Sequence, residues 1–161
     1  MTILRFDDYL VMRWKNGLGE TREIAREPLA GEFSWRLSMA TVGQFAEFST
    51  FEGVTRVLAV VEGEALSLTV DGVATVLHRG GASARFSGEV PAAAEALGAA
   101  VTDLNLMIRG SLQGAVEPIG TGRVDPGDGV TMIVDLATLD THIVDEPIEW
   151  VGEGYLVRVT G

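Results

Sequence analysis

The glycines constrain the fold of this chain most, because they divide it into short segments that suit β-strands. Many of the 20 glycines stand between runs of β-branched or alternating apolar residues. The glycines in these positions are Gly53, Gly63, Gly72, Gly80, Gly81, Gly88, Gly110, Gly120, Gly122, Gly127 and Gly129. Many short strands joined by tight turns are typical of all-β proteins, so we predict a β-sandwich or β-barrel.

Individual segments support this prediction. Residues 33–40 alternate between two faces of an expected strand. One face carries Phe33, Trp35, Leu37 and Met39, and the other carries Ser34, Arg36, Ser38 and Ala40. Residues 57–61 are continuously apolar, as expected for a strand that is buried on both faces. Residues 66–77 predict a hairpin around Asp71-Gly72, because this dipeptide favours the positive φ angles of a type I′ turn. Residues 131–136 and 155–159 predict two further strands.

Two segments are more complex. Residues 91–100 are rich in alanine, begin with proline and contain Gly98 as a stop signal, so they suit a helical turn or an irregular strand. Residues 21–25 suit an extended segment with two different faces. Thr21, Glu23 and Ala25 are expected on one face, and Arg22 and Ile24 on the other.

Composition excludes several classes of function. The 161 residues suit one globular domain, or two small ones that share a core. The net charge of −11 argues against a nucleic acid or an anionic membrane surface as partner. The sequence contains no long apolar run and no signal-peptide pattern near its start. We therefore expect a soluble, cytoplasmic protein whose partner is a small molecule or another protein, with a homodimer as one option.

The chain lacks the usual signals of a metal or cofactor enzyme. Without cysteine it has no thiolate ligand, no disulfide and no Cys nucleophile. Its 2 histidines, His78 and His142, lie far apart in sequence, whereas an imidazole-bound metal normally needs several convergent ligands. No nucleophile elbow, phosphate-binding loop or dinucleotide-binding motif is present. We therefore predict neither a metal nor a cofactor.

Three polar clusters are candidates for a binding site. The first runs from Trp14 to Ile24, and the second is the polar face that carries Arg36 and Ser38. The third covers residues 103–109, where Asp103 and Asn105 share a face with Met107. A carboxylate and an amide beside a methionine suggest a polar cavity, although satisfaction of backbone groups at a strand end would explain them equally well.

In this order the clusters resemble the HutD/Ves family of bacterial proteins. The matching motifs span residues 14–107. They are Trp14-x-Asn16-Gly17-x-Gly19-x-Thr21-Arg22-Glu23-Ile24, Phe33-x-Trp35-Arg36-Leu37-Ser38-x-Ala40-x-Val42, Gly53-Val54-x-Arg56-x-Leu58, Glu62-Gly63, Phe86-x-Gly88 and Asp103-Leu104-Asn105-x-Met107. The chain departs from the family pattern at Gly43-Gln44-Phe45-Ala46, which affects the shape of a loop.

The resemblance implies a cupin-type β-barrel or sandwich in a bicupin arrangement, within one compact unit over residues 1–161. The halves would cover about 1–85 and 86–161, with an exchange of strands between them as one option. It also implies a regulatory role in histidine utilisation without catalysis. The implied ligands are small acidic metabolites such as formylglutamate or urocanate, and a small barrel can hold one such ligand.

An acidic protein needs a local cation to bind an anionic metabolite. Arg36 is the first candidate and Arg56 the second. The other expected ligand-binding residues are Trp14, Asn16, Thr21, Glu23, Ser38, Phe86, Asp103, Asn105 and Met107. Asp103 would orient Arg36 or accept an N–H of the ligand, and a purely structural Arg36–Asp103 ion pair remains an alternative.

Two other classes of function remain open. The first is a metal-independent isomerase or hydrolase that acts on a small carboxylate, with Asp103 or Glu23 as general base. The second is a protein-interaction module that uses exposed strand edges.

Overall fold

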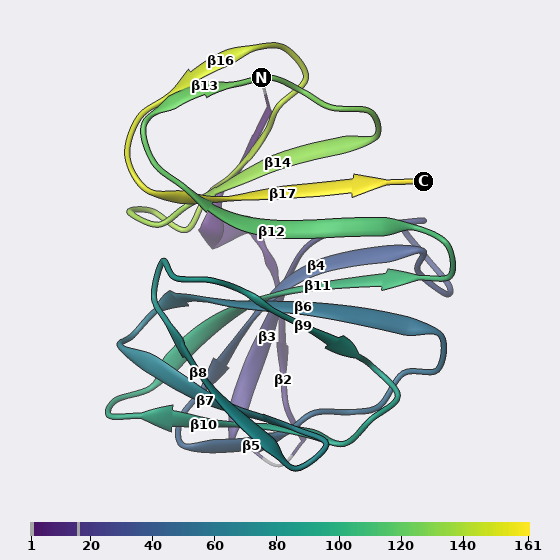
Figure 1. Ribbon diagram of the computed structural model, residues 1–161, viewed down its shortest axis with the longest axis vertical. Helices are drawn as coiled ribbons and strands as arrows, with labels where there is room; N and C mark the ends of the chain where they lie inside the picture. Colours follow the sequence, from purple (N-terminus) through teal and green to yellow (C-terminus); the bar gives the residue numbers. More distant parts are fainter. Residues whose placement is uncertain (1, 16) are drawn as a thin grey trace.

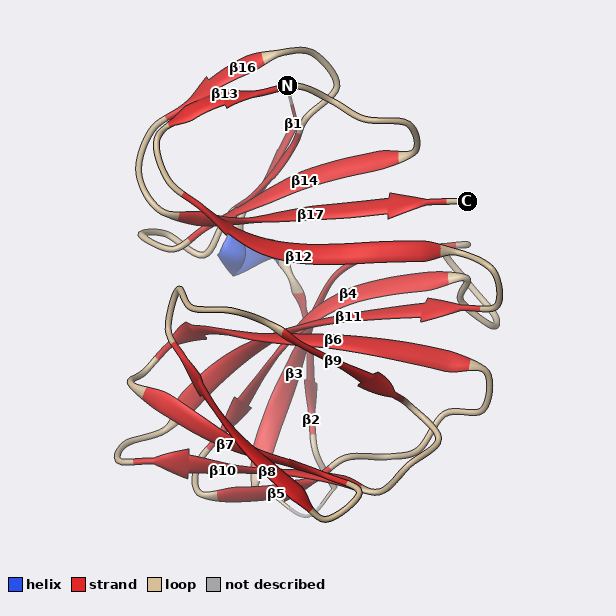
Figure 2. Ribbon diagram, in the orientation of Figure 1, coloured by secondary structure: helices blue, strands red, loops and turns tan. Residues whose placement is uncertain are grey.

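The computed structural model describes residues 2–15 and 17–161, which form an almost purely β structure (Figures 1 and 2). Within these residues the one helical element is the short 3₁₀ turn η1 (Phe6–Asp8). No helix of the described chain is long and apolar enough to cross a membrane. The predicted all-β class is confirmed. The four sheets form a layered, sandwich-like arrangement and do not close into one barrel.

A six-stranded antiparallel sheet lies at the centre of the molecule and packs against a four-stranded sheet. The central sheet has the order β2 (Leu10–Arg13), β3 (Gly19–Glu27), β4 (Trp35–Val42), β11 (Val101–Arg109), β6 (Val54–Glu62) and β9 (Ala84–Ser87). The four-stranded sheet has the order β5 (Phe45–Glu47), β10 (Ala92–Leu97), β7 (Ala65–Val70) and β8 (Val73–His78).

The later part of the chain forms the upper body in Figure 1. Its five-stranded sheet has the order β1 (Thr2–Leu4), β15 (Thr141–Ile143), β14 (Val130–Asp135), β17 (Gly154–Thr160) and β12 (Gln113–Ile119). A strand pair covers it, formed by β13 (Gly122–Val124) and β16 (Ile148–Trp150). Strand β1 thus joins strands from the far end of the chain, and β11 lies between β4 and β6. The boundary expected near residue 85 stays a prediction.

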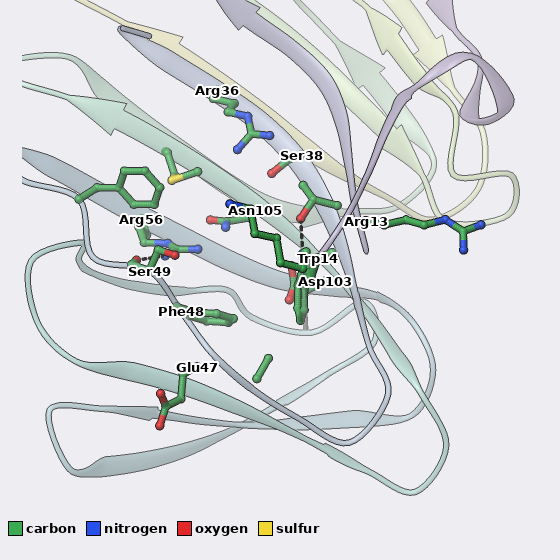
Figure 3. A pocket seen from close by; sticks show the side chains of 16 residues that line it. Arg13, Trp14, Arg36, Ser38, Glu47, Phe48, Ser49, Arg56, Asp103 and Asn105 are labelled. Atoms are coloured by element: carbon green, nitrogen blue, oxygen red, sulfur yellow. Dashed lines mark hydrogen bonds between the residues drawn. The ribbon is translucent and has the colours of Figure 1, made fainter. Parts of the chain in front are cut away.

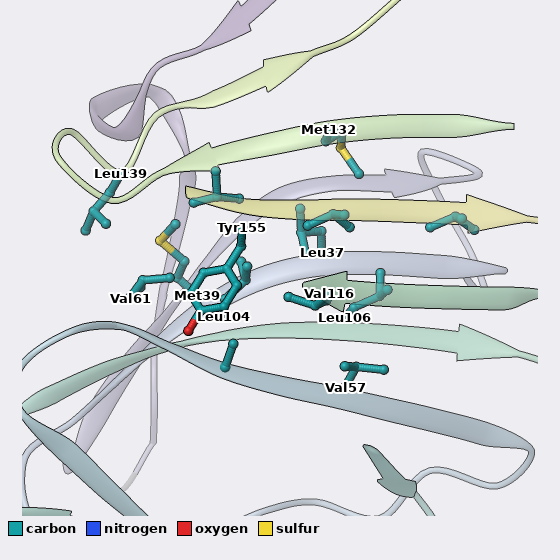
Figure 4. Close-up of a cluster of buried hydrophobic side chains, with 14 of the residues drawn as sticks. Leu37, Met39, Val57, Val61, Leu104, Leu106, Val116, Met132, Leu139 and Tyr155 are labelled. Carbon is teal, nitrogen blue, oxygen red and sulfur yellow. The ribbon is translucent and has the colours of Figure 1, made fainter. Parts of the chain in front are cut away.

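The two faces of the central sheet enter different hydrophobic clusters. On one face Leu37 and Leu104 pack in a cluster with Tyr155 of the five-stranded sheet, and all three residues are 0% exposed (Figure 4). On the other face Leu58 and Val60 pack with the four-stranded sheet. Strand β6 contributes to both clusters, so the prediction of a strand buried on both faces is confirmed.

The predicted hairpin is also confirmed. Strands β7 and β8 pair from Ala65↔His78 to Val70↔Val73. Asp71 and Gly72 form the turn with φ angles of +48° and +82°, as a type I′ turn requires. The predicted strands at 131–136 and 155–159 correspond to β14 and β17.

The helical option for residues 91–100 is wrong, and strand β10 forms there instead. This strand pairs with β5 on one side and β7 on the other. Its small residues Ala92 and Ala94 are buried between the sheets, where tertiary packing outweighs the helix propensity of alanine. Gly98, with φ of +96°, follows the end of the strand.

Two expected side-chain faces are corrected. The β3–β4 register shifts between Glu23 and Ala25 at a β-bulge, so Ala25 packs toward the large core and no longer shares a face with Thr21 and Glu23. Phe33 precedes β4 and packs in a cluster with Met107, on the side opposite Leu37. The alternation of β4 therefore begins at Trp35 and does not extend back to Phe33.

Candidate functional site

A cavity of about 540 Å³ lies on the polar face of the central sheet. The sheet supplies its floor, and strand β5, the segment after it and the end of strand β2 supply the other sides (Figure 3). The lining residues are Arg13, Trp14, Lys15, Thr21, Arg36, Ser38, Ala40, Ala46, Glu47, Phe48, Ser49, Phe51, Arg56, Asp103, Asn105 and Met107.

Strand register arranges the floor of the cavity in rows across the sheet. The first row contains Arg36, Met107, Arg56 and Phe86. The second contains Glu23, Ser38, Asn105 and Leu58. The third contains Thr21, Ala40, Asp103 and Val60. Since alternate residues of a strand share a face, these rows place cationic, amide and carboxylate groups on one surface.

Arg56 is the buried cation of the site. Its side chain lies 4.7 Å from the ring centroid of Phe48, and its Nη1 donates to the Ser49 carbonyl oxygen at 3.2 Å. Its Nε has no hydrogen-bond partner among the described residues. Burial lowers the pKa of Arg56 to about 10, with Asp103 opposing and Arg36 adding to the shift. The guanidinium therefore remains charged at neutral pH, and Arg56 is one of the residues that line the cavity.

Asp103 is the buried carboxyl group of the site and is 1% exposed. Neither of its oxygens has a hydrogen-bond partner in the described part of the chain. Burial raises its pKa from the ordinary 3.8 to about 7, while the charge of Arg56 and the Ala40 backbone amide oppose this rise. Near neutral pH this group can therefore accept hydrogen bonds, or exchange a proton with a molecule in the cavity.

Arg36 and Trp14 already have partners within the protein. Arg36 Nε donates to Glu23 Oε1 at 2.9 Å, so the alternative of an Arg36–Asp103 ion pair is wrong. Register explains this result, because Arg36 lies opposite Met107 while Asp103 lies opposite Ala40. Trp14 Nε1 donates to Thr21 Oγ1 at 2.9 Å, which fixes the indole at the cavity wall.

The structure brings most of the expected site residues together. Those that line the cavity are Trp14, Thr21, Arg36, Ser38, Arg56, Asp103, Asn105 and Met107. Glu23 lies behind the lining as the partner of Arg36, and Phe86 lies beside the guanidinium of Arg56, 5.8 Å from it to the ring centroid. Asn16 lies outside the described residues.

The wall opposite the sheet was not predicted from the sequence. This wall includes Phe48, Ser49 and Phe51, which follow strand β5. Arg13 was not predicted either, and Figure 3 shows its side chain pointing away from the other labelled residues. Lys15 lies within the first polar cluster but was not among the expected ligand-binding residues. The sequence signal for this wall was the pair Phe48 and Phe51, just before Gly53. Their spacing does not show which face of the protein they occupy.

Other candidate sites are weaker. A second cavity of about 410 Å³ lies in the five-stranded part, lined by Arg123 and Arg158 among others. Both arginines already have partners at Asp125: Arg123 lies 2.9 Å from its carboxylate, and Arg158 donates to its backbone carbonyl oxygen at 3.1 Å. Within the described residues, no three His, Asp or Glu side chains group in a way that could hold a metal ion.

Comparison with known sequences identifies related proteins. The family model named HutD matches residues 6–137. An uncharacterised 21.2 kDa protein in the hutC 3′ region of Pseudomonas putida is 39% identical over 109 residues, which cover 66% of this chain and 57% of that protein. Protein Ves of Cronobacter sakazakii is 36% identical over 97 residues, covering 60% of this chain and 54% of that protein. The matched segments thus span little more than half the length of these relatives.

Solved structures extend the similarity to nearly the whole chain. HutD from Pseudomonas fluorescens SBW25, in a formate condition, has a TM-score of 0.87 at 28% identity and covers 99% of this chain and 97% of its own. A conserved protein of unknown function from Pseudomonas aeruginosa has a TM-score of 0.84 at 28% identity, covering 99% and 98%. A cupin domain of an Enterobacter cloacae transcriptional regulator has a TM-score of 0.50 at 18% identity and covers 58% of this chain and 98% of its own, which supports only the cupin-like fold.

Proposed function

Because this chain belongs to the HutD family, we propose that its cavity binds a small carboxylate metabolite and that this binding has a regulatory role in histidine utilisation. The family is associated with the histidine-utilisation locus. Formylglutamate and urocanate are the ligands we propose, bound without a metal and without chemical conversion. Both are small enough for a cavity of about 540 Å³.

The single observation that carries this proposal is the buried, incompletely hydrogen-bonded guanidinium of Arg56 in the cavity lining. A buried guanidinium with an unpaired Nε is costly unless an anion or another acceptor satisfies it. Its Cζ lies 4.7 Å from the Phe48 ring centroid, and a planar guanidinium matches the geometry of a carboxylate. Arg36 is a weaker anchor than the sequence suggested, because Glu23 already neutralises it. We therefore assign Arg56 as the main anion contact and Arg36 as a secondary one.

The rest of the cavity suits a small polar ligand. Phe48, Phe51 and Met107 supply apolar walls, while Ser38 and Asn105 supply neutral polar groups. Pockets of this kind use a few placed polar groups on a mostly apolar lining. The local positive charge also offsets the repulsion that a protein of net charge −11 exerts on an anion.

Calorimetric titration tests the proposal. We expect formylglutamate or urocanate to bind wild-type protein saturably, while the diamide of formylglutamate gives no heat. Replacing Arg56 by methionine is expected to weaken binding by about 1.5–3 kcal/mol, roughly 10- to 150-fold, because a charge-assisted contact is lost.

Arg109→Met is the matched control. Arg109 also lies over an aromatic ring, 4.8 Å from the centroid of Phe33, and donates to backbone carbonyls, but it does not line the cavity. This variant is expected to bind like wild type. The proposal fails if folded Arg56→Met, checked by circular dichroism, binds the acids as tightly as wild type, or if no acid binds at all.

A further inference from the structure

The buried polar atoms of the cavity are unequally divided between donors and acceptors. Among the described residues, its buried side-chain atoms without a partner comprise one donor, Arg56 Nε, and three acceptors. The acceptors are the two carboxyl oxygens of Asp103 and Asn105 Oδ1. Buried polar groups are normally satisfied, so these atoms indicate which complementary groups an occupant must bring.

A carboxylate alone satisfies only part of this set. Its oxygens accept hydrogen bonds, so they match Arg56 but offer nothing to Asp103 or Asn105. A second anionic group near Asp103 would also place two negative charges in a buried site, which disfavours the ionised form of one of them. An N–H or O–H group on the ligand would instead donate to Asp103, and a hydrogen bond to a buried carboxylate is among the stronger kinds.

The two kinds of group lie at different positions along strand β11. Arg56 is in register with Met107, and Asp103 lies four residues before Met107 on the same strand. At about 3.3 Å per residue, the backbone rows are roughly 13 Å apart, and the long arginine side chain shortens the gap. A small ligand can therefore present its carboxylate to Arg56 and a different group to Asp103.

We propose that the cavity selects carboxylates that also carry a hydrogen-bond donor, and that Asp103 is the specificity-determining residue that accepts from this donor. The inference rests on the proposed function, since it concerns the same cavity. The ligand class is a small acid with an amide, hydroxyl or ring N–H group away from its carboxylate. Acids of equal size that present only acceptors at that end bind more weakly. A donor on the ligand would stabilise the ionised form of Asp103 and so lower its pKa from about 7.

Two probes of nearly equal size test the inference. Succinamate and monomethyl succinate each carry one carboxylate, but the first ends in an amide that donates and the second in an ester that only accepts. Titrated into wild-type protein at pH 7.5, succinamate is expected to bind about tenfold or more tightly than the ester, as expected for one hydrogen bond to a charged group. Asp103→Asn is expected to reduce this preference to about threefold or less, since the charge assistance is lost.

Asp71→Asn is the control, because it removes the same charge from an exposed turn outside the cavity. It is expected to keep the full preference. Equal binding of the two probes by wild type, with Arg56 still required, would overturn the inference and leave the proposed function standing. A preference that survives in Asp103→Asn would also overturn it. If neither probe nor the acids of the preceding section bind, both the inference and the proposed function are wrong.

Discussion

Asp103→Asn is expected to stabilise the protein at pH 8 by about 2–4 kcal/mol. Burial raises the pKa of Asp103 to about 7 in the folded protein, against an ordinary value of 3.8. The unfolded chain therefore releases the proton of this group at lower pH than the folded protein does. Wild-type stability is lost as pH rises between these two values, at up to about 1.4 kcal/mol per pH unit, and the loss is complete above pH 7.

Urea unfolding at pH 5 and pH 8 measures this effect. The stability difference between Asp103→Asn and wild type should be larger at pH 8 than at pH 5, because the neutral amide does not ionise in this range. Asp71→Asn controls for the reduced net charge and should show a small, nearly constant difference. Equal stabilities of Asp103→Asn and wild type at pH 8 would contradict the described burial of an unpartnered carboxyl group.

This prediction also bears on function. The described neighbours of Asp103 offset its burial only in part: the Arg56 charge and the Ala40 backbone amide lower its pKa, but burial still raises it to about 7. The presence of such a group in the cavity is understandable if it contacts a ligand. A stabilising Asp103→Asn substitution that also removes ligand discrimination would connect the two observations.

Leu104→Ala is expected to cost about 3–5 kcal/mol of unfolding free energy. Leu104 is 0% exposed and lies in the cluster between the central and five-stranded sheets (Figure 4). Truncation there removes buried apolar surface and leaves a cavity between two sheets that cannot easily collapse. Leu97→Ala is the matched control, because Leu97 is 38% exposed, and it should cost less than about 1 kcal/mol.

The same experiment examines whether the chain unfolds as one unit. We propose that it does, since the large core combines strands from both parts of the sequence. Far-ultraviolet circular dichroism and tryptophan fluorescence should then give one coincident transition that Leu104→Ala shifts as a whole. Two separate transitions, with only one of them shifted by Leu104→Ala, would show that the five-stranded sheet and the central sheet unfold independently.

Local patterns predicted the strands well because the signals were themselves local. The alternation from Trp35 to Met39 follows from the two-residue period of a strand, and Asp71-Gly72 follows from the backbone angles of its turn. The face of Ala25 was predicted wrongly because a β-bulge inserts one residue and reverses the alternation after it. The pairing partners of a strand determine such a bulge, and they are distant in sequence.

The candidate site was predictable on its floor and not on its wall. Arg36, Ser38, Asp103 and Asn105 lie on strands whose alternation marks a polar face, and the family motifs include them. The partner of Arg36 was not predictable, because Glu23 meets it only through the β3–β4 register. The aromatic wall at 48–51 reaches the cavity through the packing of the four-stranded sheet, which no local pattern specifies.

A crystal structure with a bromine-labelled acid shows whether the cavity between the central and four-stranded sheets binds a carboxylate at Arg56. The probe is 4-bromopyrrole-2-carboxylate, which carries a carboxylate, a ring N–H and an anomalous scatterer. We expect a bromine peak inside the cavity near Phe48 or Met107, with the carboxylate in contact with Arg56. An empty cavity at saturating probe, or a probe found only beside Arg123 and Arg158, would contradict this prediction.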